Sequence, residues 1–286
     1  MSDAVLTRTA SHIRELVEGW RATHQTVALV PTMGNLHRGH MSLVELAAES
    51  ADKIVMSIFV NPTQFGPDED YVAYPRTLAE DRGLMAETGL VDGVFVPSVE
   101  EIYPFGPENA VRFAMPALSR ELCGATRPGH FDGVASVVCR LINIVGPDVI
   151  VLGRKDYQQL ILVEHMIADL RLRVHVISGE TQREPDGLAI SSRNRYLTAE
   201  ERSHAPKLHA TLMRVREALQ NGERDFVALQ AGAMKALREA GFKPDYVEVR
   251  HAADLTKPNG RDQPSELIVL AAAWLGKARL IDNLHV

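Results

Sequence analysis

Pro31-Thr-Met-Gly-Asn-Leu-His-Arg-Gly-His40 is the stretch that decides the fold of this chain. It follows an apolar run at residues 26–30 that is typical of a buried strand, and it precedes a helical pattern at residues 39–50. A glycine-containing turn between a strand and a helix is where α/β proteins bind phosphate, because the N–H groups of a helix N-terminus attract anions. The stretch therefore predicts a phosphate site on a parallel sheet.

The rest of the chain extends this pattern and then changes it. Short apolar runs alternate with helical patterns up to about residue 180, as in a parallel sheet covered by crossover helices. Strands are expected at residues 26–30, 53–60, 91–96, 148–152 and 173–177, and helices at 39–50, 77–88, 131–145 and 155–170. Two helices (199–220 and 226–240) and three strands (246–250, 267–272 and 278–282) are expected after that point. We predict an α/β domain of residues 1–182 and a smaller α+β domain of residues 183–286.

Composition and charge exclude several classes of protein. Of the 286 residues, 45% are hydrophobic and 24% are charged, which are globular proportions that exclude disorder, collagen and coiled coil. The net charge of −6 argues against binding nucleic acid or an anionic membrane through a bulk positive field. The charge divides into −8 for residues 1–180 and +2 for residues 181–286. An anionic ligand must therefore be bound by local donors.

The cysteines and the apolar runs predict a location. Cys123 and Cys139 are the only cysteines, and they form no CxxC pair, which favours a reducing cytosol. The N-terminal residues lack the apolar segment of a secretory signal. The longest apolar run, residues 267–275, has nine residues, about half of what a membrane-spanning helix requires. We expect a soluble, cytoplasmic protein with neither a nucleic-acid partner nor a membrane partner.

The turn itself excludes two common nucleotide motifs. Gly34 and Gly39 have the spacing of a P-loop, but His40 and Met41 stand where that motif requires Lys and Ser or Thr. The turn also lacks the G-x-G-x-x-G fingerprint of dinucleotide-binding proteins, so a nicotinamide enzyme is not expected.

His37 and His40 are three residues apart, so both side chains project toward one side of the helix start and reach the same anion. Two other interpretations exist for an isolated H-x-x-H. One is a pair of surface or capping histidines, and the other is a metal site, which needs a third ligand. The glycines, the preceding strand and the following helix favour the phosphate interpretation.

Gly153-Arg-Lys-Asp-Tyr-Gln-Gln159 repeats the strand-to-helix context after residues 148–152 and opens at the same sheet edge. Lys155 is a candidate cation for binding a phosphoryl group, and Asp156 is a candidate acceptor for a ribose hydroxyl. Gln159 is a candidate amide for recognising a substrate by hydrogen bonds. A helix cap at Asp156 and a solvated Lys155 explain the local sequence equally well.

Three further segments are candidates. The hydroxyls and Arg193 of Ile190-Ser-Ser-Arg-Asn-Arg195 can clamp phosphate, although the local sequence fits a polar loop before a capping box at Thr198-Ala-Glu-Glu201 slightly better. Asn61-Pro-Thr-Gln-Phe65 places Gln64 at the sheet edge, and its alternative is a plain Asn-Pro turn. Glu80 and Asp81 are candidate outer ligands for Mg²⁺ or a solvated helix face.

Taken together, the motifs resemble those of the pantothenate synthetase (pantoate–beta-alanine ligase) family, in the nucleotidylyltransferase superfamily. The resemblance spans residues 31 to about 197. Six ordered stretches carry it, namely Pro31–His40, Asn61–Phe65, Tyr74–Thr77, Arg127–Phe131, Gly153–Gln159 and Asp186–Asn194.

The resemblance implies a Rossmann-like nucleotide-binding domain with a C-terminal α+β lid, in a homodimer. It implies an ATP-dependent ligase that joins (R)-pantoate to beta-alanine and releases AMP and diphosphate. The reaction passes through a pantoyl-adenylate and serves pantothenate and coenzyme A biosynthesis. The implied partners are the small molecules ATP, which is a substrate, (R)-pantoate and beta-alanine, with Mg²⁺ as the cofactor.

The resemblance also implies roles for single residues. His40, His37 and Lys155 would be catalytic, with His40 in the position of proton donation. Gln64 and Gln159 would bind pantoate, and Arg127 would help to receive beta-alanine. Glu80 and Asp81 match acidic residues associated with Mg²⁺ in part of the family, with Leu84 in place of a polar partner. ATP would be bound by Met33, Gly34, Asn35, Leu36, His37, Arg38, Gly39, His40, Gly153, Arg154, Lys155, Asp156, Gln182, Ile190, Ser191, Ser192 and Arg193.

Two other functions remain open at this point. A nucleotidyltransferase with a phosphate ester as acceptor would need more cations at the acceptor pocket than Gln64 and Gln159 provide. A silent nucleotide-binding regulator would have no need to keep His37, His40 and Lys155.

Overall fold

Two units of chain make up the fold in the computed structural model, which describes residues 4–67, 69 and 71–286. The first unit comprises Met1–Arg154 and Leu162–Glu180, and the second comprises Lys155–Ile161 and Thr181–Val286. The second unit therefore includes a short segment that lies within the predicted first domain. The division into domains at residues 182 and 183 stays a prediction.

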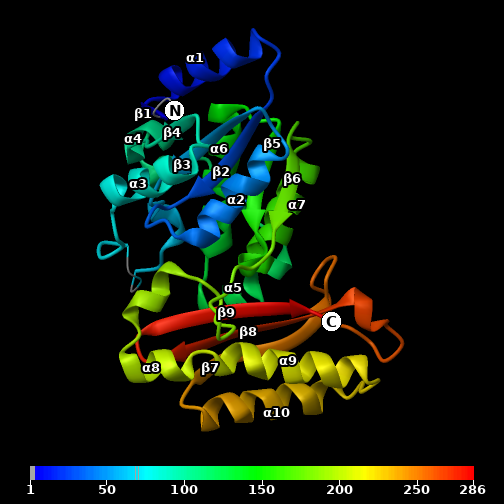
Figure 1. Ribbon diagram of the computed structural model, residues 1–286. Helices are drawn as coiled ribbons and strands as arrows, with labels where there is room; N and C mark the ends of the chain where they lie inside the picture. Colours follow the sequence, from blue (N-terminus) through cyan, green and yellow to red (C-terminus); the bar gives the residue numbers. More distant parts are fainter. Residues whose placement is uncertain (1–3, 68, 70) are drawn as a thin grey trace. The chain divides into compact units, whose positions relative to one another are not determined.

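The first unit contains a six-stranded sheet in which all neighbouring strands run parallel, drawn from blue to green in Figure 1. The strand order is β1-β4-β3-β2-β5-β6. The order reverses at β2, because β3 lies on one side of it and β5 on the other. Ligands of open parallel sheets bind outside the carboxyl ends of the strands at such a point. The strands are β1 (Val5–Thr7), β2 (Val27–Thr32), β3 (Lys53–Ile58), β4 (Gly93–Phe95), β5 (Val149–Gly153) and β6 (His175–Gly179).

Helices cover both faces of this sheet (Figure 1). One face packs on α2 and α3 through a buried apolar core that includes Val30, Val44, Met56 and Met85. On the other face α6 contacts β2 and α1. The helices are α1 (Ala10–Arg21), α2 (Arg38–Ala48), α3 (Leu78–Thr88), α4 (Val99–Ile102), α5 (Cys123–Thr126) and α6 (His130–Val145), with 3₁₀ turns η1 (Pro62–Gln64), η2 (Pro107–Asn109) and η3 (Ala117–Arg120). The 3₁₀ turn η4 (Arg154–Asp156) and helix α7 (Tyr157–Asp169) are divided between the two units, because Lys155–Ile161 belongs to the second.

The second unit is an antiparallel sheet in the order β7-β8-β9. Alternate residues of its central strand, from Leu267 to Leu275, join one apolar core with α9 and α10, the two yellow and orange helices of Figure 1. Its elements are η5 (Ser192–Tyr196), α8 (Ala199–His204), α9 (Lys207–Gln220), α10 (Phe226–Glu239), β7 (Lys243–His251), η6 (Pro264–Glu266), β8 (Leu267–Leu275) and β9 (Ala278–His285).

The predicted fold class is confirmed, and several single elements differ from the prediction. The helix predicted at residues 199–220 is divided into α8 and α9 by Pro206, which has no N–H to continue the hydrogen bonds of α8. The capping box at Thr198 and Glu201 is present. The prediction omitted β1 and α1, although Thr9 caps α1 through the N–H of His12 at 3.3 Å.

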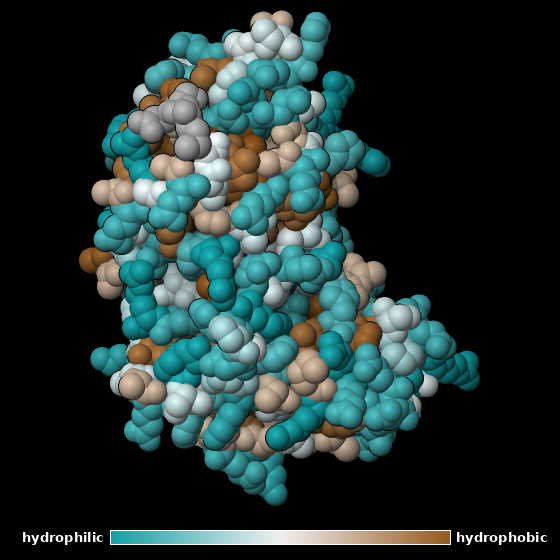
Figure 2. Space-filling model, in the orientation of Figure 1, coloured by the Kyte–Doolittle hydropathy of each residue, from teal (hydrophilic) through white to brown (hydrophobic). Residues whose placement is uncertain are grey.

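The surface agrees with the composition. On the face drawn in Figure 2, apolar residues form small patches between hydrophilic ones. Val72, Phe105, Val111 and Val227 are large apolar side chains that are strongly exposed. No helix of the described residues is long and apolar enough to cross a lipid bilayer.

Candidate active site

The turn after β2 is held in shape by the side-chain hydroxyl of Thr32. The Thr32 hydroxyl donates to the Ser57 carbonyl at 2.8 Å and accepts the N–H of Gly34 at 3.2 Å. Gly34 has a φ of +79°, and a Cβ on it would lie 3.0 Å from Ile58 Cγ2 and 3.1 Å from Asp81 Oδ2. A glycine is therefore required here, both for the left-handed backbone and for the close contact with α3.

Asp81 fixes the next two residues of this turn. Its carboxylate accepts the N–H of Asn35 at 3.1 Å and the N–H of Leu36 at 2.7 Å, and the side chain is buried. Both oxygens are thus occupied by backbone donors, and Glu80 is exposed. The described residues include no group of three or more His, Cys, Asp or Glu side chains that would hold a metal ion. The arrangement does not support the predicted Mg²⁺ site at Glu80 and Asp81, and it gives Asp81 a positioning role.

The two histidines lie together at the start of α2. Their rings stack with centroids 4.0 Å apart, and the backbone N–H of His37 donates to Nδ1 of His40 at 3.3 Å. Because Nδ1 of His40 accepts a hydrogen bond, the proton of its neutral ring is on Nε2. The capping interpretation is therefore correct for His40 Nδ1, and Nε2–H is the ring group that can donate a hydrogen bond to an anion.

Gln64 is anchored through Asn61 on the short segment that follows β3. The Asn61 amide donates to Gln64 Oε1 and to the Gly133 carbonyl, both at 3.1 Å. Tyr103 donates its hydroxyl to Asn61 Oδ1 at 2.8 Å. The Gln64 amide nitrogen lies 3.4 Å from the Met33 sulfur. Two predicted site residues, Gln64 and Met33, are thus in direct contact, and Gln64 is held by a buried asparagine that was predicted only as part of a turn.

Arg127 and His130 hold the backbone of Gln64. The Arg127 guanidinium forms two hydrogen bonds with the Glu69 carboxylate, at 2.7 and 2.6 Å, and a third contact of 2.8 Å with His130 Nε2. His130 Nδ1 lies 2.8 Å from the Gln64 carbonyl oxygen. If Arg127 donates to Nε2, the neutral ring donates from Nδ1 to Gln64. These contacts assign Arg127 a positioning role, and its predicted role in binding beta-alanine stays a prediction.

The ion pair of Glu69 and Arg127 sets the ionisation of the carboxyl. Partial burial acts to raise the pKa of Glu69, but the hydrogen bonds and the charge of Arg127 outweigh it. The pKa of Glu69 therefore lies below its ordinary value, and the carboxylate is charged at neutral pH.

We expect Glu69→Gln to destabilise the protein at pH 7 by about 1 kcal/mol, and by less in acid. Because the folded pKa is lowered, the stability that Glu69 contributes is complete above its ordinary pKa of 4.5 and is lost as the pH falls through the folded value. Urea unfolding at pH 7 and below pH 4.5 measures the difference. Glu239→Gln, in an exposed pair with Lys235, is the control with little change. An equal loss at both pH values would contradict the prediction.

Gly133 of α6 packs closely against the backbone of η1. A Cβ on Gly133 of α6 would lie 2.2 Å from the Thr63 carbonyl oxygen and 2.7 Å from the Gln64 nitrogen. Real Cβ atoms do not approach backbone atoms so closely, so only glycine allows α6 to pack against η1.

The carboxyl end of β5 carries Arg154, the last of the predicted residues in the first unit. Its guanidinium bonds to the Ser178 hydroxyl at 2.9 Å and to the Glu180 carboxylate. Because β5 pairs with β2, Arg154 follows the strand beside the one that ends in the histidine turn.

The second unit holds the remaining predicted residues. Lys155 Nζ lies 3.6 Å from Asp156 Oδ2, and Gln159 follows on α7. The Gln182 carbonyl accepts the N–H of Ile190 at 2.9 Å, which places these two residues side by side. The Ser191 hydroxyl accepts the N–H of Arg193 at 3.3 Å and caps η5. Ser192 is the first residue of η5. The segment predicted as a polar loop therefore also contains the residues predicted to bind ATP.

The structure thus brings the predicted residues together in two groups. One surrounds the ends of β2 and β5 in the first unit, and the other lies in the second unit. That the two groups face one crevice stays a prediction. Sequence analysis did not identify Asn61, Glu69, Tyr103 or His130 as site residues. His130 stood inside the quoted Arg127–Phe131 motif and Asn61 inside the quoted Asn61–Phe65 motif, which were the available signals.

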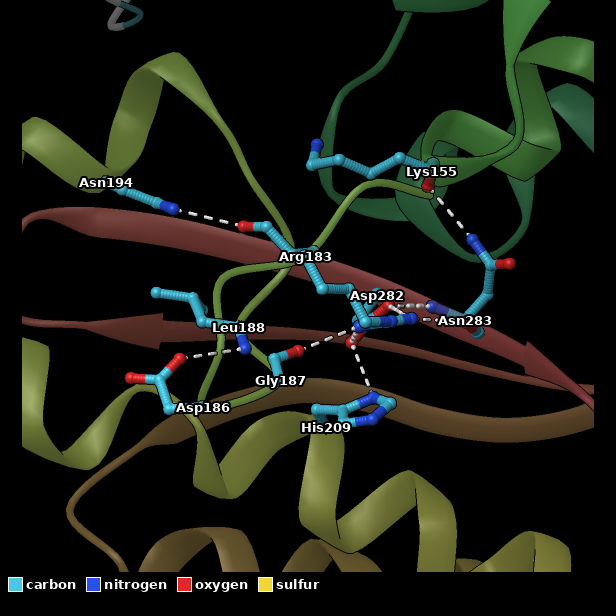
Figure 3. Close-up of polar contacts among 10 residues, drawn as sticks. Lys155, Arg183, Asp186, Gly187, Leu188, Asn194, His209, Asp282 and Asn283 are labelled. Atoms are coloured by element: carbon cyan, nitrogen blue, oxygen red, sulfur yellow. Dashed lines mark hydrogen bonds and ion pairs between the residues drawn. The ribbon is translucent and has the colours of Figure 1, made fainter. Parts of the chain in front are cut away.

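A buried ion pair organises the second group. Arg183 contacts both oxygens of Asp282, at 2.7 and 2.8 Å, and His209 Nδ1 lies 3.5 Å from the same carboxylate (Figure 3). Burial acts to raise the pKa of Asp282, but the hydrogen bonds from His209 and Arg183 and the charge of Arg183 outweigh it. The pKa of Asp282 is therefore lowered, and the buried carboxylate stays charged.

A histidine-bearing helix N-terminus at the point where a parallel sheet reverses its order defines a class of α/β enzymes that bind the phosphates of a nucleotide. Comparison with known proteins narrows this class. The chain belongs to the pantoate-beta-alanine ligase family, whose sequence profile matches residues 5–285. The predicted family is thereby confirmed.

Individual relatives agree with this membership. The chain is 53% identical over 279 residues to the pantothenate synthetase of Nitrosococcus oceani, covering 98% of this chain and 96% of that protein. The crystal structure of pantothenate synthetase from Thermus thermophilus is similar with a TM-score of 0.90 and 42% identity, over 98% of this chain and 99% of the other. The ligase from Francisella tularensis, complexed with β,γ-ATP and beta-alanine, has a TM-score of 0.81 and 32% identity over 99% and 97% of the two chains.

Proposed function

We propose that this chain joins (R)-pantoate to beta-alanine at the expense of ATP, through a pantoyl-adenylate, to give pantothenate, AMP and diphosphate. The observation that carries the proposal is the pair of stacked histidines at the N-terminus of α2, in a chain that matches the ligase family from residue 5 to residue 285. The Francisella relative, complexed with β,γ-ATP and beta-alanine, supports two of the three substrates.

In the first step, a carboxylate oxygen of pantoate bonds to the α-phosphorus of ATP and the bond to diphosphate breaks. Negative charge develops on the phosphate oxygens and on the departing diphosphate, so fixed donors lower the barrier. His40 supplies its Nε2–H, with His37 beside it, and α2 adds the N–H groups of its first turn. Lys155 and Arg193 are proposed to supply two further cations from the second unit.

In the second step, the amine of beta-alanine attacks the acyl carbon, and AMP leaves with the carboxylate oxygen that bonded to phosphorus. The amine loses its proton in the course of this attack. No covalent bond to the enzyme is needed. We propose that Gln64 and Gln159 bind pantoate through their amides, which suit a carboxylate and neutral hydroxyls. The position of Gln64 is supported by its contacts with Asn61, His130 and Arg127.

The remaining expectations belong to the same proposal. Mg²⁺ is proposed to be carried by the phosphates of ATP, because both oxygens of Asp81 already accept backbone N–H groups. A closing second domain would exclude water from the adenylate, which hydrolyses in its presence. The family resemblance supports this closure, the homodimer and the cytoplasmic location, and the two cysteines without a CxxC pair also favour a reducing compartment.

The proposal is tested by exchange of labelled diphosphate into ATP with beta-alanine omitted. The ligase predicts exchange that depends on pantoate, because adenylate formation is reversible on the enzyme. Exchange that needs a phosphorylated acceptor would favour a nucleotidyltransferase. Good ATP binding without any exchange would favour a nucleotide-binding regulator.

A further inference from the structure

Lys155 follows β5 of the first unit in sequence, but its contacts belong to the second unit. Figure 3 shows the lysine above β9, with its backbone carbonyl facing Asn283. The Asn283 side-chain amide donates to this carbonyl at 3.0 Å. Asn283 is only 6% exposed, so the hydrogen bond is shielded from water. A residue on the last strand of the chain therefore fixes the backbone at Lys155.

The segment after Lys155 has a second attachment to the same unit. The Tyr157 hydroxyl donates to the Ala252 carbonyl at 3.0 Å, and its ring packs against His285 with centroids 5.3 Å apart. A cavity of about 10 Å³, the size of a single water, adjoins Lys155 and Asp282. The lysine segment is therefore closely packed against β9.

Asn283 is itself held by the buried ion pair. Its backbone N–H donates to Asp282 Oδ1 at 2.8 Å, and its carbonyl accepts from Arg183 Nη2 at 3.3 Å. Arg183 directly follows Gln182, whose carbonyl accepts the N–H of Ile190. The two segments of this unit that are proposed to contact ATP thus share one anchor at Asp282 and Asn283.

We propose that Asn283 is a positioning residue for Lys155. It holds the lysine backbone in a fixed position relative to the hairpin of residues 182–190, which is proposed to contact the nucleotide. This inference rests on the proposed function, because it assumes that Lys155 binds the phosphates of ATP. Asn283 acts on the carbonyl of Lys155 and makes no contact with substrate in this role. A flexible lysine side chain reaches a phosphate with less loss of entropy when its backbone is fixed.

The test is a double-mutant cycle on the dissociation constant of ATP. Asn283→Ala removes the amide but keeps the backbone contacts of residue 283 with Asp282 and Arg183. We expect it to weaken ATP binding about fivefold to tenfold when Lys155 is present, and to have almost no effect in the Lys155→Ala background. An equal loss in both backgrounds would overturn the proposal, because it would show a general structural role. Asn259→Ala, which removes an exposed asparagine that bonds to Asp262, is the control with unchanged binding.

Hydrogen exchange gives a readout that is independent of ATP. In Asn283→Ala, the amides of residues 155–161 are expected to exchange faster than in the wild type, with the rest of β9 unchanged. Unchanged exchange there would overturn the positioning proposal alone, whereas failure of the wild type to bind ATP would overturn the proposed function. If Asn283→Ala does not fold, Asn283→Ser, whose hydroxyl is too short to reach the carbonyl, is expected to give the same two results.

Discussion

Replacing His40 by alanine is expected to lower the rate of pantoyl-adenylate formation by a factor of about 10² to 10⁴. The substitution removes the Nε2–H donor from the N-terminus of α2, where charge develops on the phosphate oxygens. It also removes the acceptor of one long hydrogen bond, of 3.3 Å, from the half-buried N–H of His37. Stability should therefore change by only about 1 kcal/mol. Diphosphate exchange measures the rate, and thermal unfolding measures the stability.

The control for this prediction is His12→Ala, because His12 is an exposed histidine on α1, outside the site. It should retain full activity. If His40→Ala keeps its activity, the histidine pair is a helix cap and no more. If His40→Ala loses its activity only because it unfolds, the residue belongs to the core of the first unit rather than to the site.

Gly133→Ala is expected to raise the KM for pantoate about tenfold or more and to destabilise the protein by about 1–3 kcal/mol. The new methyl group would collide with the Thr63 carbonyl and the Gln64 nitrogen, which are backbone atoms. Either α6 or η1 must move, and this movement carries Gln64 away from the position that Asn61 and His130 set. Steady-state kinetics with pantoate varied, together with urea unfolding, measure the two effects.

Gly19→Ala is the matched control, because Gly19 is also a helical glycine and a Cβ built on it has no neighbour within 4 Å. There the substitution is expected to stabilise the protein by about 0.5–1 kcal/mol through helix propensity. Equal effects at both positions would show that the backbone contact at Gly133 is not a constraint on the site.

The sequence was sufficient to predict the parts of the fold that depend on local pattern. The apolar run into Pro31, the glycines at 34 and 39 and the helical periodicity after them predicted β2, its turn and α2. The signal for dividing the helix at residues 199–220 was also present, since Pro206 cannot extend a hydrogen-bonded turn. The signal for α1 was present as well, because Thr9 is a good N-cap residue and Ile13 and Val17 have helical spacing.

Local pattern did not predict the contacts that join distant residues. Asp81 was predicted as a candidate outer ligand for Mg²⁺ or as part of a solvated helix face, and no local pattern indicated its observed partners, the N–H groups of residues 35 and 36 in another loop. The role of Arg127 in binding beta-alanine stays a prediction, but its ion pair with Glu69, which is 58 residues away, could not be predicted from local pattern. Nothing in the sequence around Lys155 indicates that Asn283 binds its carbonyl. These roles depend on packing that only the folded chain supplies.

The most direct measurement follows the oxygen atoms of pantoate. Pantoate labelled with ¹⁸O in its carboxylate is incubated with ATP, beta-alanine and the enzyme, and the products are analysed by mass spectrometry. Attack on the α-phosphate predicts one ¹⁸O in AMP, because the bond that breaks when the amine attacks lies between carbon and that oxygen. Label in inorganic phosphate together with ADP, or pantothenate formed with unlabelled AMP, would contradict a pantoyl-adenylate.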